Sequence, residues 1–277
     1  MNDILELLSY PFVYRALIAG SLISVCASVL GVILVLKHYS LIGHGLSEIG
    51  FASLSLSSAL NLPAMYVAAP SVFASSFVIM FVSRKYRTAG DIAIAAASSS
   101  ALALGIAISS LSGKTSNMNS YLFGSVLAVD EVDLVTAVIL SVIVIVTFIV
   151  LYNRLFLITY NEDYARSLGI NTALYQMIIS VLTALVVVMG MKMTGTLLIS
   201  GVIILPAVTA KIIASGFKSL VIISGVISFV AFIGGLTLSF VFNIPAGAGV
   251  ILMNTAVLIL VRLAVRKLVT LRLKTGA

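Results

Sequence analysis

The stretch "LVTAVILSVIVIVTFIVLY", residues 134–152, decides the fold class because it runs for 19 residues without a charged side chain. A helix needs about 20 apolar residues to cross the ~30 Å hydrocarbon layer of a bilayer. This run is therefore long enough to be a membrane span. Comparable apolar runs recur from one end of the chain to the other, so the run belongs to a repeated pattern and is not an isolated buried helix.

The composition of the whole chain indicates the same class. Of its 277 residues, 61% are hydrophobic and 9% are charged, which is about one third of the charged share of a soluble domain. The mean hydropathy is +1.23. Such a chain cannot cover its apolar surface in water, so the sequence predicts an all-α polytopic membrane protein. No shift in composition marks a boundary, and we expect a single membrane domain over residues 1–277.

The candidate spans number nine. They lie at roughly 16–36, 45–61, 64–83, 92–112, 134–152, 173–190, 195–213, 219–242 and 247–265. The second is short, with Gly43, Gly45 and Gly50 at its start and Pro63 after its end, which predicts a broken or half-length span. About nine transmembrane helices (eight to nine) are therefore expected, because the second segment could be dropped from the count.

Lys and Arg residues indicate the orientation, because cytoplasmic loops carry an excess of them. With the N-terminus outside and the C-terminus in the cytoplasm, 13 of the 16 basic residues fall on the cytoplasmic side. These are Lys37, Arg84, Lys85, Arg87, Arg154, Arg166, Lys211, Lys218, Arg262, Arg266, Lys267, Arg272 and Lys274. The outer side receives Arg15, Lys114 and Lys192, and with them the acidic residues Asp130, Glu131 and Asp133. Dropping the second span would spoil this division, so nine spans are preferred.

One stretch, "LIGHGLSEIG" at 41–50, places an imidazole and a carboxylate inside the apolar region. His44 and Glu48 lie about 10–16 Å beyond Lys37 at 1.5 Å per residue, and their i,i+4 spacing puts both on one helix face. Ionisable groups at this depth usually mark a transport pathway. The pair suits Zn²⁺, Mn²⁺ or Fe²⁺, but a proton relay and a structural ion pair between helices are the alternatives.

A second polar stretch is the longest predicted cytoplasmic loop, about 153–172. It mixes apolar residues with Glu162, Asp163 and Arg166 and reaches Gly169, which predicts a short amphipathic helix with a glycine stop. This loop is either a solvated connector or a docking helix for a soluble partner.

Pro206 interrupts the apolar stretch "GTLLISGVIILPAVTAK" at 195–211. A proline inside a span predicts a kink or a broken helix. Breaks of this kind often lie near transport sites, so Pro206 is a candidate pathway residue.

The chain shows no motif for enzymatic chemistry. "SGKT" at 112–115 resembles the end of a P-loop, but Ile108 stands where the first glycine is required. No HExxH motif is present, the single Cys26 excludes a disulfide framework, and the basic residues are too scattered for a nucleic-acid surface. We therefore expect no enzyme activity, and energy for transport would come from a separate ATPase subunit or an ion gradient.

Six stretches, in order, resemble the membrane permease of the metal-ion ABC importers, the zinc, manganese and iron transporters of bacteria. "VLKHYSLIGHGLSEIGFASLSLS" is similar to the family segment with a Gly-Asp-x-Leu-Ser-His-Ala core. "YNEDYARSLGIN" is similar to its cytoplasmic Asp-Glu-x-x-Ala-x-x-x-Gly loop. The other four are "AGDIAIAAASSSALALGI", "YLFGSVLAVDEVDL", "GTLLISGVIILPAVTA" and "FVFNIPAGAGVIL".

This resemblance implies a homodimeric permease with the large ABC-importer fold, related to the cobalamin permeases, in the bacterial plasma membrane. It implies cytoplasmic ABC ATPase subunits docking at the 160–170 loop, and a metal-binding lipoprotein or periplasmic binding protein outside. The cargo would be a divalent metal ion, with no permanently bound cofactor. The family's metal ligands, the Asp and His of its Gly-Asp-x-Leu-Ser-His core, fall on His44 and Glu48. Here their order is reversed, although one imidazole and one carboxylate are kept.

Three functions remain open from the sequence. The first is the permease subunit of an ATP-driven importer for Mn²⁺, Zn²⁺ or Fe²⁺. The second is a stand-alone proton-coupled transporter that uses His44 and Glu48 as its relay. The third is a permease of the same fold that carries a metal chelate in a wider pocket, which the small residues Gly45, Ser47, Gly50 and Ala52 allow.

Overall fold

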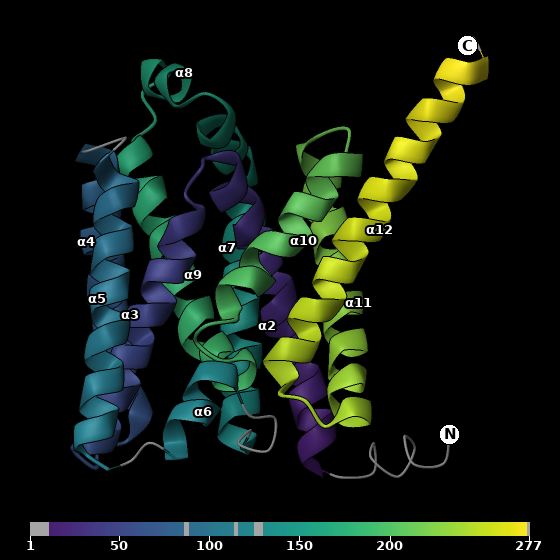
Figure 1. Cartoon of the computed structure of the whole chain (residues 1–277). Helices are drawn as coiled ribbons and strands as arrows, with labels where there is room; N and C mark the ends of the chain where they lie inside the picture. The colour runs from purple at the N-terminus through teal and green to yellow at the C-terminus, as the bar shows by residue number, and fades with distance from the viewer. Residues whose placement is uncertain (1–10, 86–88, 114–115, 125–129, 276–277) are drawn as a thin grey trace.

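The computed structural model describes residues 11–85, 89–113, 116–124 and 130–275, and the regular secondary structure of these residues is helical. Most of the helices run side by side in one direction and together form a slab, which is called the layer below. α8 and the C-terminal end of α12 lie at the same end of this layer (Figure 1). The helices are α2 (Pro11–Leu36), α3 (Ser40–Ala59), α4 (Ala64–Lys85), α5 (Ala89–Leu111), α6 (Ser116–Phe123), α7 (Glu131–Tyr160), α8 (Glu162–Ser167), α9 (Thr172–Thr194), α10 (Ile199–Ile213), α11 (Phe217–Phe242) and α12 (Ala246–Thr275).

Seven of these helices are long and apolar enough to cross a membrane, which makes the chain a multi-span membrane protein. They are α2, α4, α5, α7, α9, α11 and α12. The shorter α10 and the serine-rich α3 run within the same layer (Figure 1). Each of the nine predicted segments overlaps one long helix, but the number of membrane crossings stays a prediction because α3 and α10 fall outside the seven.

The predicted break in the second span was wrong. α3 is continuous over 20 residues, about 30 Å at 1.5 Å per residue. Its glycines serve close packing instead of breaking the helix. A Cβ atom at Gly45 would lie 2.9 Å from Ile94 Cγ2 of α5, and one at Gly50 would lie 2.7 Å from Met191 Sδ of α9.

The predicted break at Pro206 is also absent, because α10 continues through this residue from Ile199 to Ile213. The shortened element is α10 itself, which has 15 residues. A proline frees carbonyl groups in the preceding turn, and neighbouring helices can cover them. A Cβ atom at Gly31 of α2 would lie 1.8 Å from the carbonyl oxygen of Ile203, so only a glycine lets α2 approach this turn of α10.

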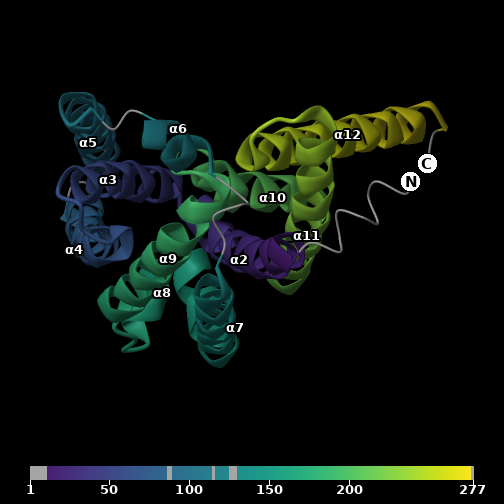
Figure 2. The same cartoon turned by 90° about the horizontal axis from the view of Figure 1, so that it is seen from below.

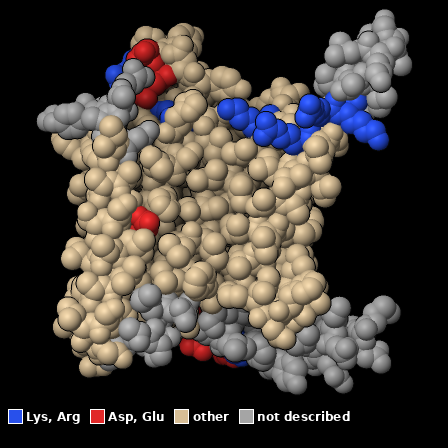
Figure 3. Space-filling model, viewed as in Figure 1, with Lys and Arg blue, Asp and Glu red and all other residues tan. Residues whose placement is uncertain are grey.

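Charged side chains gather at the two ends of the layer (Figure 3). The described basic residues at the α8 end are Lys37, Arg154, Arg166, Lys211, Lys218, Arg262, Arg266 and Lys267, whereas Arg15 and Lys192 lie at the start of α2 and the end of α9. Of the other basic residues used for the orientation, Arg87 and Lys114 lie outside the described residues, as do the side chains of Arg84, Lys85, Arg272 and Lys274. The division between the two ends agrees with the predicted one.

The end opposite α8 is held together by two ion pairs. Lys192 Nζ of α9 lies 2.6 Å from Asp133 Oδ1 at the start of α7, and Arg15 of α2 pairs with Glu131. Asp130 and Asp133 also form a capping box at the start of α7. The acidic cluster predicted for the outer side is therefore used to fix the start of the longest apolar helix to its neighbours.

Candidate metal site and coupling helix

α3 positions the two polar residues of the membrane region. His44 is its fifth residue and Glu48 its ninth, so both lie in the first half of the helix. α3 packs against α4, α5 and α9 and also contacts α10. Gly43 and Gly45 on either side of His44 allow this, because a Cβ at Gly43 would already lie 3.3 Å from Ile203 Cδ1 of α10.

The structure brings the predicted pair together. His44 Nε2 lies 3.3 Å from Glu48 Oε1 across one helix turn. The second carboxylate oxygen, Oε2, is buried and has no hydrogen-bond partner. A buried polar group of this kind costs free energy unless something binds it, so Glu48 has one free acceptor site beside the imidazole.

The pair is open on one side. The His44 side chain is 41% exposed, while that of Glu48 is 6% exposed. Leu41, one turn before His44 on the same side of α3, is 37% exposed, and Leu56 further along the helix is 40% exposed. The described residues contain no group of three or more His, Cys, Asp or Glu side chains able to hold a metal. One protomer therefore presents an imidazole and a carboxylate, but no third described side chain of these types beside them, on a partly exposed face of α3.

The loop predicted at about 153–172 contains the helix that the sequence predicted, although α7 extends to Tyr160 and shortens the loop. α8 has six residues, and the side chain of Asn161 accepts a hydrogen bond from the Tyr164 backbone N–H at 3.0 Å. Gly169 has φ +76°, and its N–H donates to the carbonyl of Arg166 at 2.9 Å. Gly169 therefore ends the helix as predicted, because the left-handed conformation there favours glycine.

Glu162 joins three helices at this end. Lys37 Nζ, from the last turn region of α2, lies 2.9 Å from Glu162 Oε2. Gln176 Nε2 of α9 donates to the same oxygen at 2.7 Å, and Arg166 Nη2 donates to Oε1 at 2.7 Å. Arg166 Nε also donates to Thr172 Oγ1 at 3.1 Å. Both oxygens of Glu162 are thus occupied, and α8 is tied to α2 and α9.

These partners set the charge state of Glu162. Burial by itself raises the pKa of the Glu162 carboxyl, but hydrogen bonds and attraction from Lys37 and Arg166 outweigh it and hold the pKa below its ordinary value of 4.5. Glu162 is therefore an anion at neutral pH. Asp163, the next residue, is exposed at the surface of α8.

The outer surface of α8 is apolar as well as charged. Tyr164 and Leu168 are 55% and 56% exposed, and Leu174 at the start of α9 is 50% exposed. A hollow of about 570 Å³ lies beside them. It is lined by Arg154, Leu168, Gly169, Ile170, Asn171, Leu174 and Tyr175. Exposed apolar side chains outside the membrane layer are typical of a protein interaction surface.

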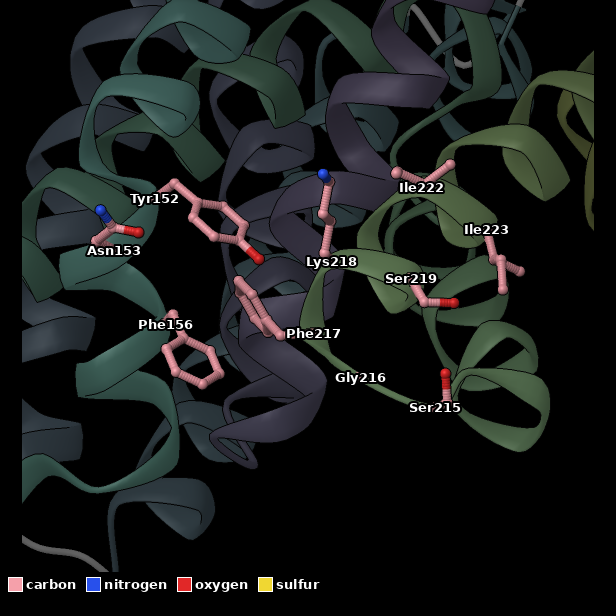
Figure 4. A pocket seen from close by; sticks show the side chains of 10 residues that line it. All are labelled: Tyr152, Asn153, Phe156, Ser215, Gly216, Phe217, Lys218, Ser219, Ile222 and Ile223. Carbon is pink, nitrogen blue, oxygen red and sulfur yellow. The ribbon is translucent and has the colours of Figure 1, made fainter.

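A second cavity lies elsewhere and contains none of the predicted site residues. It has a volume of about 760 Å³ and lies between the last turns of α7 and the start of α11 (Figure 4). Pro206 is buried in α10 and lines neither of these two cavities. Its place beside the pathway stays a prediction.

Sequence reasoning missed Lys37 and Gln176 as partners of Glu162. Lys37 was used only as a charge that marks the membrane edge. Its side chain is 7% exposed in the structure, but a lysine at the end of an apolar run does not show which loop will cover it. Gln176, in the second turn of a later helix, carried no signal in the sequence.

Known proteins resemble this chain over nearly its whole length. The manganese import system permease protein ScaB of Streptococcus gordonii is 27% identical over 248 residues, which cover 90% of this chain and 89% of that protein. The high-affinity zinc uptake system membrane protein ZnuB of Buchnera aphidicola is 27% identical over 248 residues, covering 89% and 95%. A chain of the solved structure of PsaBC from Streptococcus pneumoniae in complex with Fab is 27% identical, with a TM-score of 0.83 and 93% of each chain covered. The family model described as the ABC 3 transport family matches residues 9–265. The chain belongs to the ABC 3 transport family.

Proposed function

We propose that this chain is the permease subunit of an ATP-driven importer for a divalent transition-metal ion, with His44 and Glu48 as ligands in its pathway. The observation that carries the proposal is the free, buried Oε2 of Glu48 beside the His44 ring. An imidazole nitrogen and carboxylate oxygens suit Mn²⁺, Zn²⁺ or Fe²⁺. The chain itself hydrolyses no ATP, since members of its family act as permease subunits.

A homodimer completes the site in this proposal. Metal ions of this class take four or more ligands, and one protomer offers two side chains at this position. The exposed strip of Leu41, His44 and Leu56 faces away from the protomer's own core. A second copy related by a two-fold axis would meet the first along an identical strip. Two imidazoles and two carboxylates would then surround one ion.

The two ends of the layer would contact different protein partners. The α8 end would face the cytoplasm, because the described basic residues concentrate there. Tyr164, Asp163 and Leu168 would contact the ABC ATPase subunits, and the opposite end would receive the metal from a binding protein. In this orientation α3 and α10 also cross the membrane, so the chain would span it nine times in a single domain, with the fold of the cobalamin permeases.

The proposal is tested by metal uptake into proteoliposomes that contain the permease, its ATPase and its binding protein. Mn²⁺, Zn²⁺ and Fe²⁺ are compared for the native chain, His44→Ala and Glu48→Ala. His38→Asn is the matched control, because His38 is the other histidine, is exposed, and has φ 59°, a conformation that asparagine tolerates. We expect both site variants to abolish ATP-dependent uptake while the control retains it.

Other outcomes separate the competing functions. Uptake that persists in both site variants would reduce His44 and Glu48 to a structural pair. Uptake driven by a proton gradient without the ATPase would favour the stand-alone transporter. If only a chelated metal accumulates, the cargo is a complex and not a bare ion.

A further inference from the structure

We infer that the cavity between α7 and α11 is a binding site for an anionic phospholipid of the membrane leaflet at the α8 end. Its lining divides into an apolar and a polar part. The residues that line it are Tyr152, Asn153, Phe156, Ser215, Gly216, Phe217, Lys218, Ser219, Ile222 and Ile223. None of these residues belongs to α8 or to the proposed metal site on α3.

The apolar wall is preformed by aromatic packing. The Phe217 ring lies 5.5 Å from Tyr152, 5.3 Å from Phe156 and 6.5 Å from Phe148, measured between ring centroids. Phe217 is 4% exposed, so its ring is held in the cluster and cannot swing out to fill the cavity. Figure 4 shows the rings of Tyr152, Phe156 and Phe217 together, with Ile222 and Ile223 on α11 beyond them. The volume therefore exists before any ligand enters.

The apolar part continues along the membrane direction. One and two turns further from the cavity on the same face of α11, Val226 and Phe229 are 58% and 45% exposed. On α7, Ile149 and Val142 are 66% and 54% exposed at the corresponding spacing. α2 packs against both helices and lies between them (Figure 2). This arrangement makes an apolar track that suits acyl chains.

The polar part carries one positive charge. Lys218 is exposed, and the ion pairs of the described residues leave it without a carboxylate. Its aliphatic stem can cover the apolar rim while the ammonium group stays at the surface. Ser215 and Ser219 add hydroxyl groups. An anionic headgroup is the complement of this end, and basic pockets between helices at the cytoplasmic side bind such headgroups.

The size and the position of the cavity favour a phospholipid over a free anion as its ligand. The cavity of about 760 Å³ is much larger than a phosphate ion, so a free phosphate beside Lys218 would leave the apolar part of the cavity empty. A phospholipid would place its phosphate near Lys218 and its chains along Ile222 and Val226. Tyr152 supports this depth, because tyrosine is enriched where the hydrocarbon layer meets the headgroups.

The test is native mass spectrometry of the full-length chain in detergent, titrated with phosphatidylglycerol or phosphatidylcholine of equal chain length. We expect phosphatidylglycerol to bind more tightly, and Lys218→Gln to weaken it about five-fold, the effect of one basic residue near an anionic lipid surface. Lys218→Arg should retain binding. Lys211→Gln is the matched control, because Lys211 is an exposed lysine at the same end of the layer that does not line the cavity.

Four results would overturn the inference. Equal binding of the two lipids, or equal loss in Lys218→Gln and Lys211→Gln, would show that headgroup charge is not read at this site. Displacement of phosphatidylglycerol by inorganic phosphate alone would make it a free-anion site. Unchanged lipid binding in Ile222→Trp, which fills the apolar part, would place the lipid elsewhere on the protein.

Discussion

Two glutamates of this chain, Glu48, which is buried, and Glu162, which is partly buried, have opposite surroundings. Glu162 has both oxygens occupied, by Lys37 and Gln176 on one and Arg166 on the other. Glu48 has His44 at 3.3 Å from one oxygen and no partner for the other. The first carboxylate is used to hold helices together, whereas the second is left available.

This difference decides what each carboxylate can bind. A fully paired carboxylate stabilises the structure but has no lone pair left for a ligand. An unpaired one costs stability in the empty protein, and that cost is recovered when a cation binds. We therefore expect changes at Glu48 to affect transport more than stability, and changes around Glu162 to do the reverse.

The largest effect should come from Glu48→Gln. The amide keeps the size of the side chain but loses the negative charge that attracts a metal ion. Losing a residue that only supports a metal ligand already lowers metal affinity or activity about ten-fold or more. We therefore expect uptake by the reconstituted importer to fall by at least about ten-fold. Its melting temperature should stay within about 2 °C of the native chain, because the removed charge was not fully paired. His38→Asn, at the exposed histidine outside the pair, is again the control. If Glu48→Gln transports normally, the comparison fails.

The next effect should come from Lys37→Met. It leaves the Glu162 carboxylate partly buried without its lysine, and we expect the free energy of unfolding to fall by about 2 kcal/mol, somewhat less than for a fully buried pair. Thermal unfolding in detergent measures this. Adding Glu162→Gln should restore part of the loss, since the uncompensated charge disappears. A Lys37→Met chain as stable as Lys211→Met would show that the network contributes nothing.

A smaller effect is expected at the end of α8. Gly169→Ala should cost about 1 kcal/mol, because φ is +76° there, while a Cβ atom would meet nothing within 4 Å. Gly216→Ala is the matched control, since its Cβ atom also meets nothing but its φ of −167° is extended. Thermal unfolding of the two variants should differ. Equal melting temperatures would remove the conformational argument for Gly169.

The smallest effect should appear on acidification. The pKa of Glu162 is lower in the folded chain than its ordinary value of 4.5. The stability that this carboxylate contributes is therefore fully present above about pH 4.5 and is lost as the pH falls through the lower folded value. The difference in melting temperature between the native chain and Glu162→Gln should be constant from pH 7 to about 5 and shrink below that. A difference that is constant down to pH 3 would contradict the assigned charge state.

Much of the architecture could be predicted from the sequence, because the constraint is local. Residues 134–152 and the other apolar runs must form helices, since a backbone in hydrocarbon has to satisfy its own hydrogen bonds. The i,i+4 spacing of His44 and Glu48 likewise placed both on one turn. The short helix before Gly169 could be predicted for the same reason, as it depends on neighbouring residues.

Packing between distant segments was decided only by the tertiary structure. The glycines around His44 suggested a broken span, but they are the positions where α5, α9 and α10 approach a continuous α3. Pro206 suggested a break, yet α10 continues through it and packs against Gly31 of α2. The partners of Glu162 come from residues 125 and 14 positions away. Sequence alone determined which segments are helices and where Glu48 and Glu162 lie in them. The contacts between helices decided that Glu162 is paired and that one oxygen of Glu48 is free, because those contacts join residues far apart in the chain.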